Sequence, residues 1–210
     1  ELQVELVKLQ ILPTVAVSIS IPFFAAIFVM EMYRQRPDPF TNIAHTIVGI
    51  IYIMAPLALL NVFTFTEIID EYNPGVVLGF FIMLWLNDTG AYVFGRLFGR
   101  HKLFPRVSPN KTWEGFAGGT LFAGIAAWLL HIYAGEEDMA LWQWLVLSLL
   151  IVFSSTLGDL FESALKRNHG IKDSGKLMPG HGGILDRIDS LLVAMPVTFL
   201  FLKLVATNSL

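Results

Sequence analysis

Long apolar stretches alternate with short polar connections along this 210-residue chain. The apolar stretches lie near 9–30, 42–63, 75–95, 115–134, 141–165 and 184–206. About 20 apolar residues in helical conformation cross a hydrocarbon layer of ~30 Å, so each stretch is long enough to span a membrane. The pattern predicts an all-α, polytopic membrane protein with about six transmembrane helices in this chain.

The composition agrees with a membrane protein and narrows the chemistry. Hydrophobic residues make up 55% of the chain and charged residues 15%, whereas a soluble domain carries about 25% charged residues. The chain has no cysteine, which excludes disulfides and thiolate metal sites. No repeat period or soluble segment interrupts it, so we expect one integral membrane domain over 1–210. Because the chain begins with Glu1 and not with Met, we expect further N-terminal spans in the full-length protein.

Basic residues predict the orientation in the membrane. Every second connection between the predicted spans lies on the same side of the membrane. Twelve of the 14 Lys and Arg residues fall in or beside the connections of one side, and only Lys8 and Lys203 fall on the other. Connections rich in Lys and Arg face the cytoplasm. We therefore expect the connections at 31–40, 96–114 and 166–183 to be cytoplasmic, in a multi-pass protein of the plasma (inner) membrane whose active site faces the cytoplasm.

Four acidic residues lie inside or at the start of predicted spans, namely Asp88, Asp159, Asp186 and Asp189. At 1.5 Å per helical residue, all four lie within roughly 12 Å of the cytoplasmic surface. A carboxylate in a membrane costs at least ~2.5 kcal/mol unless it is paired, hydrated or metal-bound. Each acid taken alone is equally explained by pairing with a nearby Lys or Arg at the interface. Their common depth in three spans favours a shared polar cavity open to the cytoplasm.

The polar segment 157–190 combines carboxylates, cations and glycines. Asp159, Glu162/Ser163 and Lys166 follow at i, i+3/i+4 and i+7 and so share a helix face. Asp186 and Asp189 are three residues apart on the next helix. Two helices that present carboxylates favour Mg²⁺, which prefers oxygen ligands, and we expect Asp159 and Asp186 to be its ligands. The sequence PGHGG between them lets backbone N–H groups approach a phosphate at a helix N-terminus, although alone it is equally typical of a tight turn.

The second polar segment, 86–119, contains the sequence SPNKTWEG. Ser108, Asn110, Lys111 and Thr112 place several hydrogen-bond donors just before a helix start, and Glu114 is positioned to cap that helix. The basic residues nearby also serve as the positive-inside signal. Such a cluster of donors suits a triphosphate or a polar head group.

The run SALKRNHGIKDSGKLMPGHGGILDRID resembles the signature of the phosphatidate cytidylyltransferases, also called CDP-diglyceride synthetases. The segments NDTGAYVFGRLFGRHKLFPRVSPNKTWEG and STLGDLFES also resemble segments of that family. The likeness covers roughly 85–190. Every position of the signature is filled, by Ser163, Lys166, Arg167, Lys172, Asp173, Ser174, His181, Gly182, Gly183, Asp186, Arg187 and Asp189.

This resemblance implies a reaction in which CTP and phosphatidate give CDP-diacylglycerol and diphosphate, with Mg²⁺ as cofactor. It also implies a homodimer, a second cation such as K⁺ near the Mg²⁺, membrane lipid as the surroundings and no nucleic acid. The expected catalytic residues are Asp159, Asp186, Asp189, Lys166 and Arg187. The expected substrate-binding residues are Asp88, Ser108, Asn110, Lys111, Thr112, Ser163, Arg167, Lys172, Asp173, Ser174, His181, Gly182 and Gly183.

Two other functions share part of this pattern. A CTP-dependent polyprenol or phytol kinase would use the same nucleotide, metal and membrane but direct attack to the γ-phosphate; the complete signature disfavours it. A transporter with a polar core would show inverted repeats and a site at the membrane midplane. No repeat is apparent here, and the charged residues lie toward one face.

Overall fold

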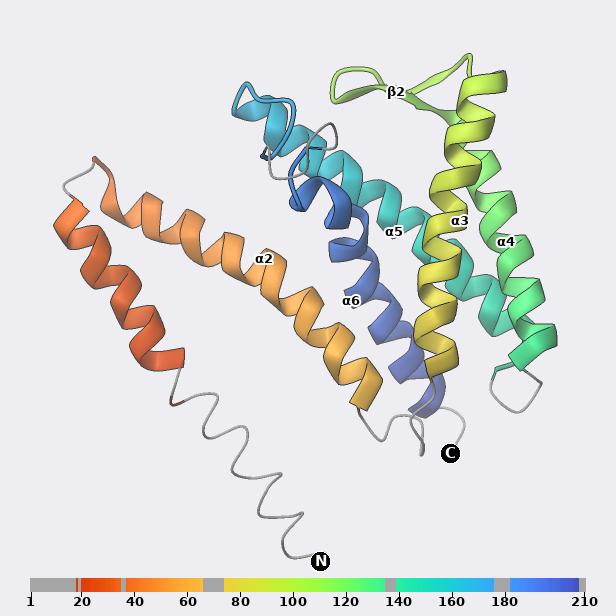
Figure 1. Cartoon of the computed structure of the whole chain (residues 1–210), viewed down its shortest axis with the longest axis horizontal. Helices are drawn as coiled ribbons and strands as arrows, with labels where there is room; N and C mark the ends of the chain where they lie inside the picture. The colour runs from red at the N-terminus through yellow and green to blue at the C-terminus, as the bar shows by residue number, and fades with distance from the viewer. Residues whose placement is uncertain are drawn as a thin grey trace, which may run out of the picture. The chain divides into compact units, whose positions relative to one another are not determined.

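The computed structural model describes residues 18, 20–34, 37–65, 74–134, 139–175 and 182–207. After a helix at 20–34, it contains α2 (Pro39–Phe65), α3 (Pro74–Phe98), α4 (Trp113–Ala134), α5 (Leu141–Asn168) and α6 (Leu185–Thr207) (Figure 1). Among the described residues, the five helices α2 to α6 are long and apolar enough to cross a membrane. This confirms the all-α, polytopic prediction, while most of the predicted span 9–30 lies outside the described residues.

The chain divides into two compact units, Glu1–Tyr52 and Ile53–Leu210. In the first unit, polar contacts join the helix at 20–34 to the start of α2. The Asn42 side-chain amide donates to Glu31 Oε1 at 2.6 Å and to the Pro37 carbonyl at 3.2 Å, and Arg34 lies 3.7 Å from Glu31. The predicted site residues all belong to the second unit.

Glycines allow the helices of the second unit to approach closely. A Cβ on Gly118 of α4 would lie 2.4 Å from the Phe94 side chain of α3, and a Cβ on Gly158 of α5 would lie 2.6 Å from the Asp189 carbonyl of α6. Small residues at such crossings let membrane helices pack backbone to backbone. The crossing at Gly158 also brings Asp159 next to the helix that carries Asp189.

A short hairpin connects α3 to α4, where the sequence analysis expected a polar connection without strands. Strand β1 (Lys102–Phe104) pairs antiparallel with β2 (Ser108–Thr112). Glu114 closes the hairpin, because its carboxylate accepts hydrogen bonds from the backbone N–H of Arg100 at 3.1 Å and of His101 at 3.2 Å, and lies 2.6 Å from His101 Nδ1. The cap of α4 is instead Thr112, whose hydroxyl accepts from the Gly115 N–H at 3.1 Å.

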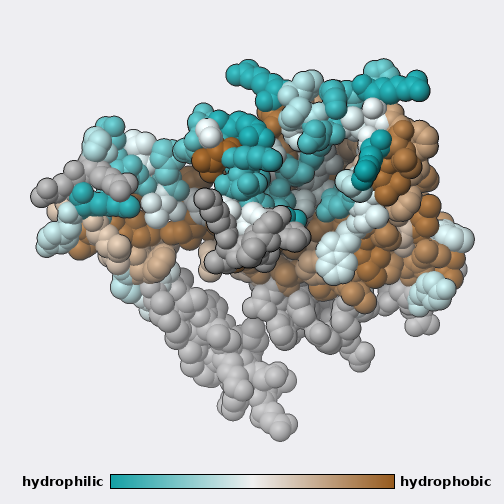
Figure 2. Space-filling view, turned by 45° about the horizontal axis from the view of Figure 1, so that its top comes forward, coloured by the Kyte–Doolittle hydropathy of each residue, from teal (hydrophilic) through white to brown (hydrophobic). Residues whose placement is uncertain are grey.

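The hairpin lies at the end of the second unit where α3 and α5 end and α4 and α6 begin (Figure 1). In Figure 2, hydrophilic residues gather over this end, and hydrophobic residues cover the flanks of the helices below it. Large apolar side chains are exposed along these flanks, among them Leu121, Trp128 and Phe153. This distribution fits helices surrounded by lipid, with one polar end.

Candidate active site

A cavity of about 510 Å³ opens beneath the hairpin. Its walls come from α3, the hairpin, the start of α4, the second half of α5 and the first turns of α6. Ligand-binding pockets measure ~300–1,000 Å³, so the cavity has the size of a small-molecule site. Its charged lining residues are Asp88, Lys111, Asp159, Lys166, Asp186, Arg187 and Asp189.

Lys111 joins the hairpin to α5. Its Nζ lies 2.6 Å from Asp159 Oδ2, and the two side chains are 24% and 39% exposed. The second oxygen of Asp159 accepts a hydrogen bond from the Ser163 hydroxyl at 3.2 Å, as their i, i+4 spacing predicts. The two polar segments of the sequence analysis, 86–119 and 157–190, are therefore in direct contact.

Lys166 bridges two acids from different helices. Its ammonium is ion-paired with Glu162, four residues earlier on α5, and lies 2.7 Å from Asp186 Oδ1 on α6. The Glu162 side chain is fully buried, Asp186 is 10% exposed and Lys166 is 15% exposed. Burying a carboxylate is costly without an opposite charge, so Lys166 compensates both acids.

Asp186 organises the loop that precedes α6. Its Oδ2 accepts hydrogen bonds from the Ser174 N–H at 2.9 Å, the Ser174 hydroxyl at 2.9 Å and the Gly183 N–H at 2.7 Å. Gly182 has φ +84°, and a Cβ there would lie 2.8 Å from Asp186 Oδ2, so glycine is required both for the turn and for the close approach. Gly182 and Gly183 therefore allow the backbone just before α6 to lie against the Asp186 carboxylate.

Asn87 links α3 to α5 at the wall of the cavity. It is buried, and its side-chain amide donates to the Ser155 hydroxyl of α5 at 3.2 Å and to Asp88 Oδ1 at 3.4 Å. A Cβ on Gly119 of α4 would lie 2.4 Å from Asn87 Oδ1, so three helices meet at this amide. These contacts orient Asp88 on the wall of the cavity. The fourth acid, Asp189 of α6, is 8% exposed and accepts a hydrogen bond from the Ser190 N–H at 2.7 Å.

The cavity offers oxygen ligands to a metal ion. Within the described ranges, no three His, Cys, Asp or Glu side chains gather closely enough to hold a metal ion by themselves. Mg²⁺ differs from a structural metal in this respect, because one or two carboxylates, substrate phosphates and water complete its shell. The acidic lining residues therefore fit Mg²⁺ bound together with a phosphate-bearing substrate.

Comparison with known proteins decides the family. The profile of the cytidylyltransferase family matches residues 3–205. The chain belongs to the cytidylyltransferase family. All the cavity walls lie within the matched residues.

Similar cytidylyltransferases come from staphylococci. The chain is 49% identical over 121 residues to the phosphatidate cytidylyltransferases of Staphylococcus saprophyticus and Staphylococcus aureus, and 47% identical to that of Staphylococcus epidermidis. The aligned region is 58% of this chain and 46% of each relative, so the chain spans about half the length of the curated relatives it matches. A solved intramembrane enzyme for archaeal membrane lipid biosynthesis is 23% identical, with a TM-score of 0.42 over 61% of this chain and 85% of that one.

In this member of the cytidylyltransferase family, one cavity is lined by most of the residues that were predicted for the site. Besides the seven charged residues, Ser108, Asn110 and Thr112 lie in its wall. Ser163, Ser174 and Gly183 do not line the cavity, but they donate hydrogen bonds to Asp159 or Asp186, which do. Other predicted residues that do not line the cavity are Arg167, Lys172, Asp173 and Gly182, and His181 lies outside the described residues.

The sequence analysis did not name several polar residues that line the cavity. Asn87, Ser155 and Ser190 line the cavity, each beside or near a predicted acid. Glu162 was placed on the helix face of Asp159 and Lys166 by its spacing but was not predicted as a site residue, and the structure pairs it with Lys166. No sequence signal separates Asn87 and Ser155 from other polar residues of membrane helices, because their roles depend on the contact between α3 and α5.

Proposed function

We propose that this chain carries the active site of a phosphatidate cytidylyltransferase, which converts CTP and phosphatidate into CDP-diacylglycerol and diphosphate. The observation that carries the proposal is the cavity at the polar end of membrane helices, where Lys111, Lys166 and Arg187 lie among four aspartates. The identity of 49% with phosphatidate cytidylyltransferases supports the same substrates.

The reaction requires two polyanions to meet. A phosphate oxygen of phosphatidate attacks the α-phosphorus of CTP, and the bond between that phosphorus and the bridging oxygen to the β-phosphate breaks, so that diphosphate leaves. Because the second pKa of a phosphomonoester is about 6, the nucleophile is already largely ionised near neutral pH and requires no strong general base. Catalysis then rests on positioning and on stabilising negative charge.

The lysines and Arg187 supply that stabilisation. Lys111 reaches the cavity from the hairpin, Lys166 from α5 and Arg187 from α6, so cations surround the cavity from three elements. Both lysines are held by aspartates, at 2.6 Å from Asp159 and 2.7 Å from Asp186. These ion pairs orient the ammonium groups before the substrate arrives, which lowers the cost of ordering them around phosphate.

Mg²⁺ is the proposed cofactor, with Asp159 and Asp186 as its ligands. The ion, when bound, would neutralise charge on the phosphates of CTP and on the leaving diphosphate. Asp88 and Asp189 line the same cavity and are the further oxygen ligands, also for a second cation such as K⁺. Asp186 has the additional task of holding the loop through Ser174 and Gly183.

The proposed orientation places the polar end at the cytoplasmic face of the plasma membrane. Arg100, Lys102, Arg106 and Lys111 lie in or next to the hairpin, and Lys166, Arg167 and Lys172 lie at or just beyond the end of α5. An excess of Lys and Arg marks the cytoplasmic side. CTP would enter from the cytoplasm and the lipid from the membrane. We also propose a homodimer, on the family resemblance described for the sequence.

The test is turnover by the purified chain in detergent micelles with α-³²P-labelled CTP, phosphatidate and Mg²⁺. We expect the label in a lipid product, CDP-diacylglycerol, and diphosphate in solution. Asp159→Asn serves as the inactive control, and Lys102→Met, an exposed lysine of β1, as the active one. Label recovered only in free CDP, with a phosphorylated alcohol formed from polyprenol or phytol, would instead identify a kinase.

A further inference from the structure

An apolar groove runs from the cavity along the contact between α4 and α5. Phe116, in the first turn of α4, lines both the cavity and the upper part of the groove, which has a volume of about 410 Å³. Thr120 and Leu149 line both this upper part and a lower part of about 440 Å³, which ends near Trp128. We call the two parts together the seam groove. The polar cavity and the upper part thus adjoin at Phe116, and the two parts of the groove adjoin at Thr120 and Leu149.

The lining of the seam groove is suited to hydrocarbon. Its two hydroxyl side chains bond within their own helices, since Thr120 donates to the Phe116 carbonyl at 2.8 Å and Ser148 donates to the Leu145 carbonyl at 2.8 Å. Gly124 lies in the lower part, and a Cβ at that position would meet nothing within 4 Å. The groove is thus hollow at Gly124, and neither hydroxyl needs a polar ligand.

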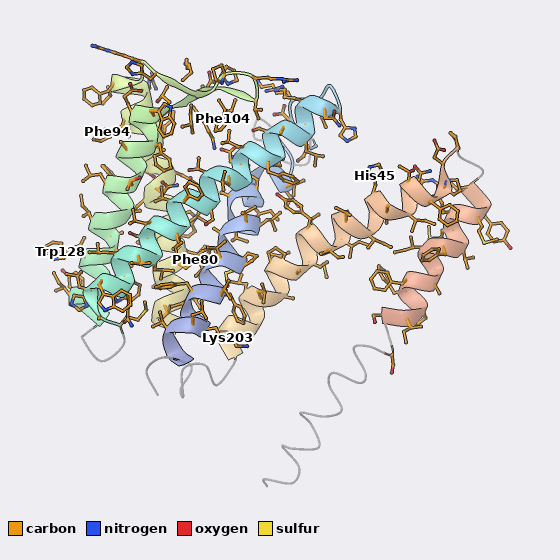
Figure 3. All side chains as sticks on the ribbon, turned by 180° about the vertical axis from the view of Figure 1, so that it is seen from behind. His45, Phe80, Phe94, Phe104, Trp128 and Lys203 are labelled. Atoms are coloured by element: carbon orange, nitrogen blue, oxygen red, sulfur yellow. The ribbon has the colours of Figure 1, made fainter. Side chains whose placement is uncertain are left out.

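The seam groove is longer than one leaflet of a membrane. Phe116 and Trp128 are twelve residues apart on α4, a rise of about 18 Å. Half of the hydrocarbon thickness is about 15 Å. Figure 3 shows Trp128 on the outer side of α4, toward the end of the helix opposite the hairpin, and its side chain is 50% exposed. A chain that starts at the cavity and follows the groove to Trp128 therefore ends beyond the middle of the bilayer, because Trp128 lies six residues before the end of α4.

We propose that the seam groove binds one acyl chain of the lipid substrate while the phosphate of that lipid lies in the cavity. This inference rests on the proposed function and adds a site for the acyl chain and a source of chain-length selectivity. The position of the groove next to the cavity, with Phe116 lining both, favours this occupant. Another apolar hollow, lined by Phe104, Leu160 and Phe161 among others, shares no lining residue with the cavity.

Filling the groove at two depths tests this proposal. Gly124 lies eight residues, about 12 Å, beyond Phe116, and Thr120 lies four residues, about 6 Å, beyond it. Gly124→Leu should block long chains and spare short ones, whereas Thr120→Phe should hinder both. Gly49→Leu is the matched control, because Gly49 of α2 also has no atom within 4 Å of its would-be Cβ and is not part of the groove lining.

The measurement is kcat/KM of the full chain for dipalmitoyl- and dioctanoyl-phosphatidate in the same mixed micelles. In Gly124→Leu we expect the ratio of long-chain to short-chain kcat/KM to fall about tenfold, the discrimination typical of a small steric change in an apolar pocket. Gly49→Leu should leave the ratio unchanged.

An unchanged ratio in Gly124→Leu, including an equal loss with both lipids, would overturn the acyl site while leaving the proposed function intact. A change of oligomeric mass in detergent without a change in ratio would also overturn it and identify the groove as a subunit interface. If the wild-type chain formed no CDP-lipid from either substrate, the proposed function itself would fail.

Discussion

Replacing Lys166 by methionine should destabilise the protein strongly. The substitution keeps the aliphatic stem and removes the ammonium that is ion-paired with Glu162 and lies 2.7 Å from Asp186. Glu162 is fully buried and Asp186 is 10% exposed, so water does little to replace the lost cation. Removing one partner of a buried ion pair costs about 3–5 kcal/mol, because a buried charge is left uncompensated.

The loss can be measured as an apparent Tm in detergent, with intrinsic tryptophan fluorescence as the signal. For a chain of this size, 1 kcal/mol corresponds to about 2–4 °C, so we expect Lys166→Met to lower Tm by about 6–20 °C. Lys102→Met removes the same charge from an exposed lysine of β1 and should change Tm by less than about 2 °C.

A second substitution separates charge compensation from lost packing. In the double variant Glu162→Gln/Lys166→Met, one of the two uncompensated acids is neutral, so part of the lost Tm should return. If Lys166→Met melted within about 2 °C of the wild type, or if the double variant melted no higher than Lys166→Met, Lys166 would not be the compensating charge of this buried pair.

Three further predictions concern the cavity and its walls. Lys111→Ala should lower kcat/KM for CTP about 10- to 150-fold, the equivalent of one charge-assisted contact, while Lys111→Arg keeps most of the activity; equal losses in both would argue against a phosphate contact. Asp159→Asn should nearly abolish CDP-lipid formation at saturating Mg²⁺ with a folded protein by size-exclusion chromatography, and near-normal turnover would remove Asp159 from the metal site. Gly119→Ala should lower Tm by about 2–12 °C, because its Cβ would lie 2.4 Å from Asn87 Oδ1. Gly124→Ala, whose Cβ would meet nothing within 4 Å, should keep or raise Tm. A lower Tm in Gly124→Ala than in Gly119→Ala would contradict the contact between α3 and α4 at Asn87.

The sequence by itself predicted the five spans that the structure describes, the polar end and most residues that line the cavity. A membrane span is a property of about 20 consecutive residues, so the apolar stretch near 115–134 predicts α4 without knowledge of its neighbours. Asp88, Asp159 and Asp186 were found because acids are costly within apolar sequence and their distance from the ends of the spans could be counted. The family signature added the expected substrates.

Only the tertiary structure decided which side chains meet. The ion pair of Lys111 with Asp159 joins residues 48 positions apart (159 − 111), and it depends on the hairpin, which the sequence analysis treated as a plain polar connection. Asn87 likewise acquired its role from Ser155 on another helix. The seam groove was also invisible in the sequence, because a groove is the space left between two helices.

The physical reason is that length and hydropathy are local properties, whereas contacts depend on how closely two helices approach and on which faces they turn to each other. Gly118 and Gly158 set that approach, since a Cβ at either position would collide with the neighbouring helix. Glycine alone does not identify its neighbour. The residues that line the cavity could therefore be named from the sequence for the most part, while their geometry required the packing of α3 to α6.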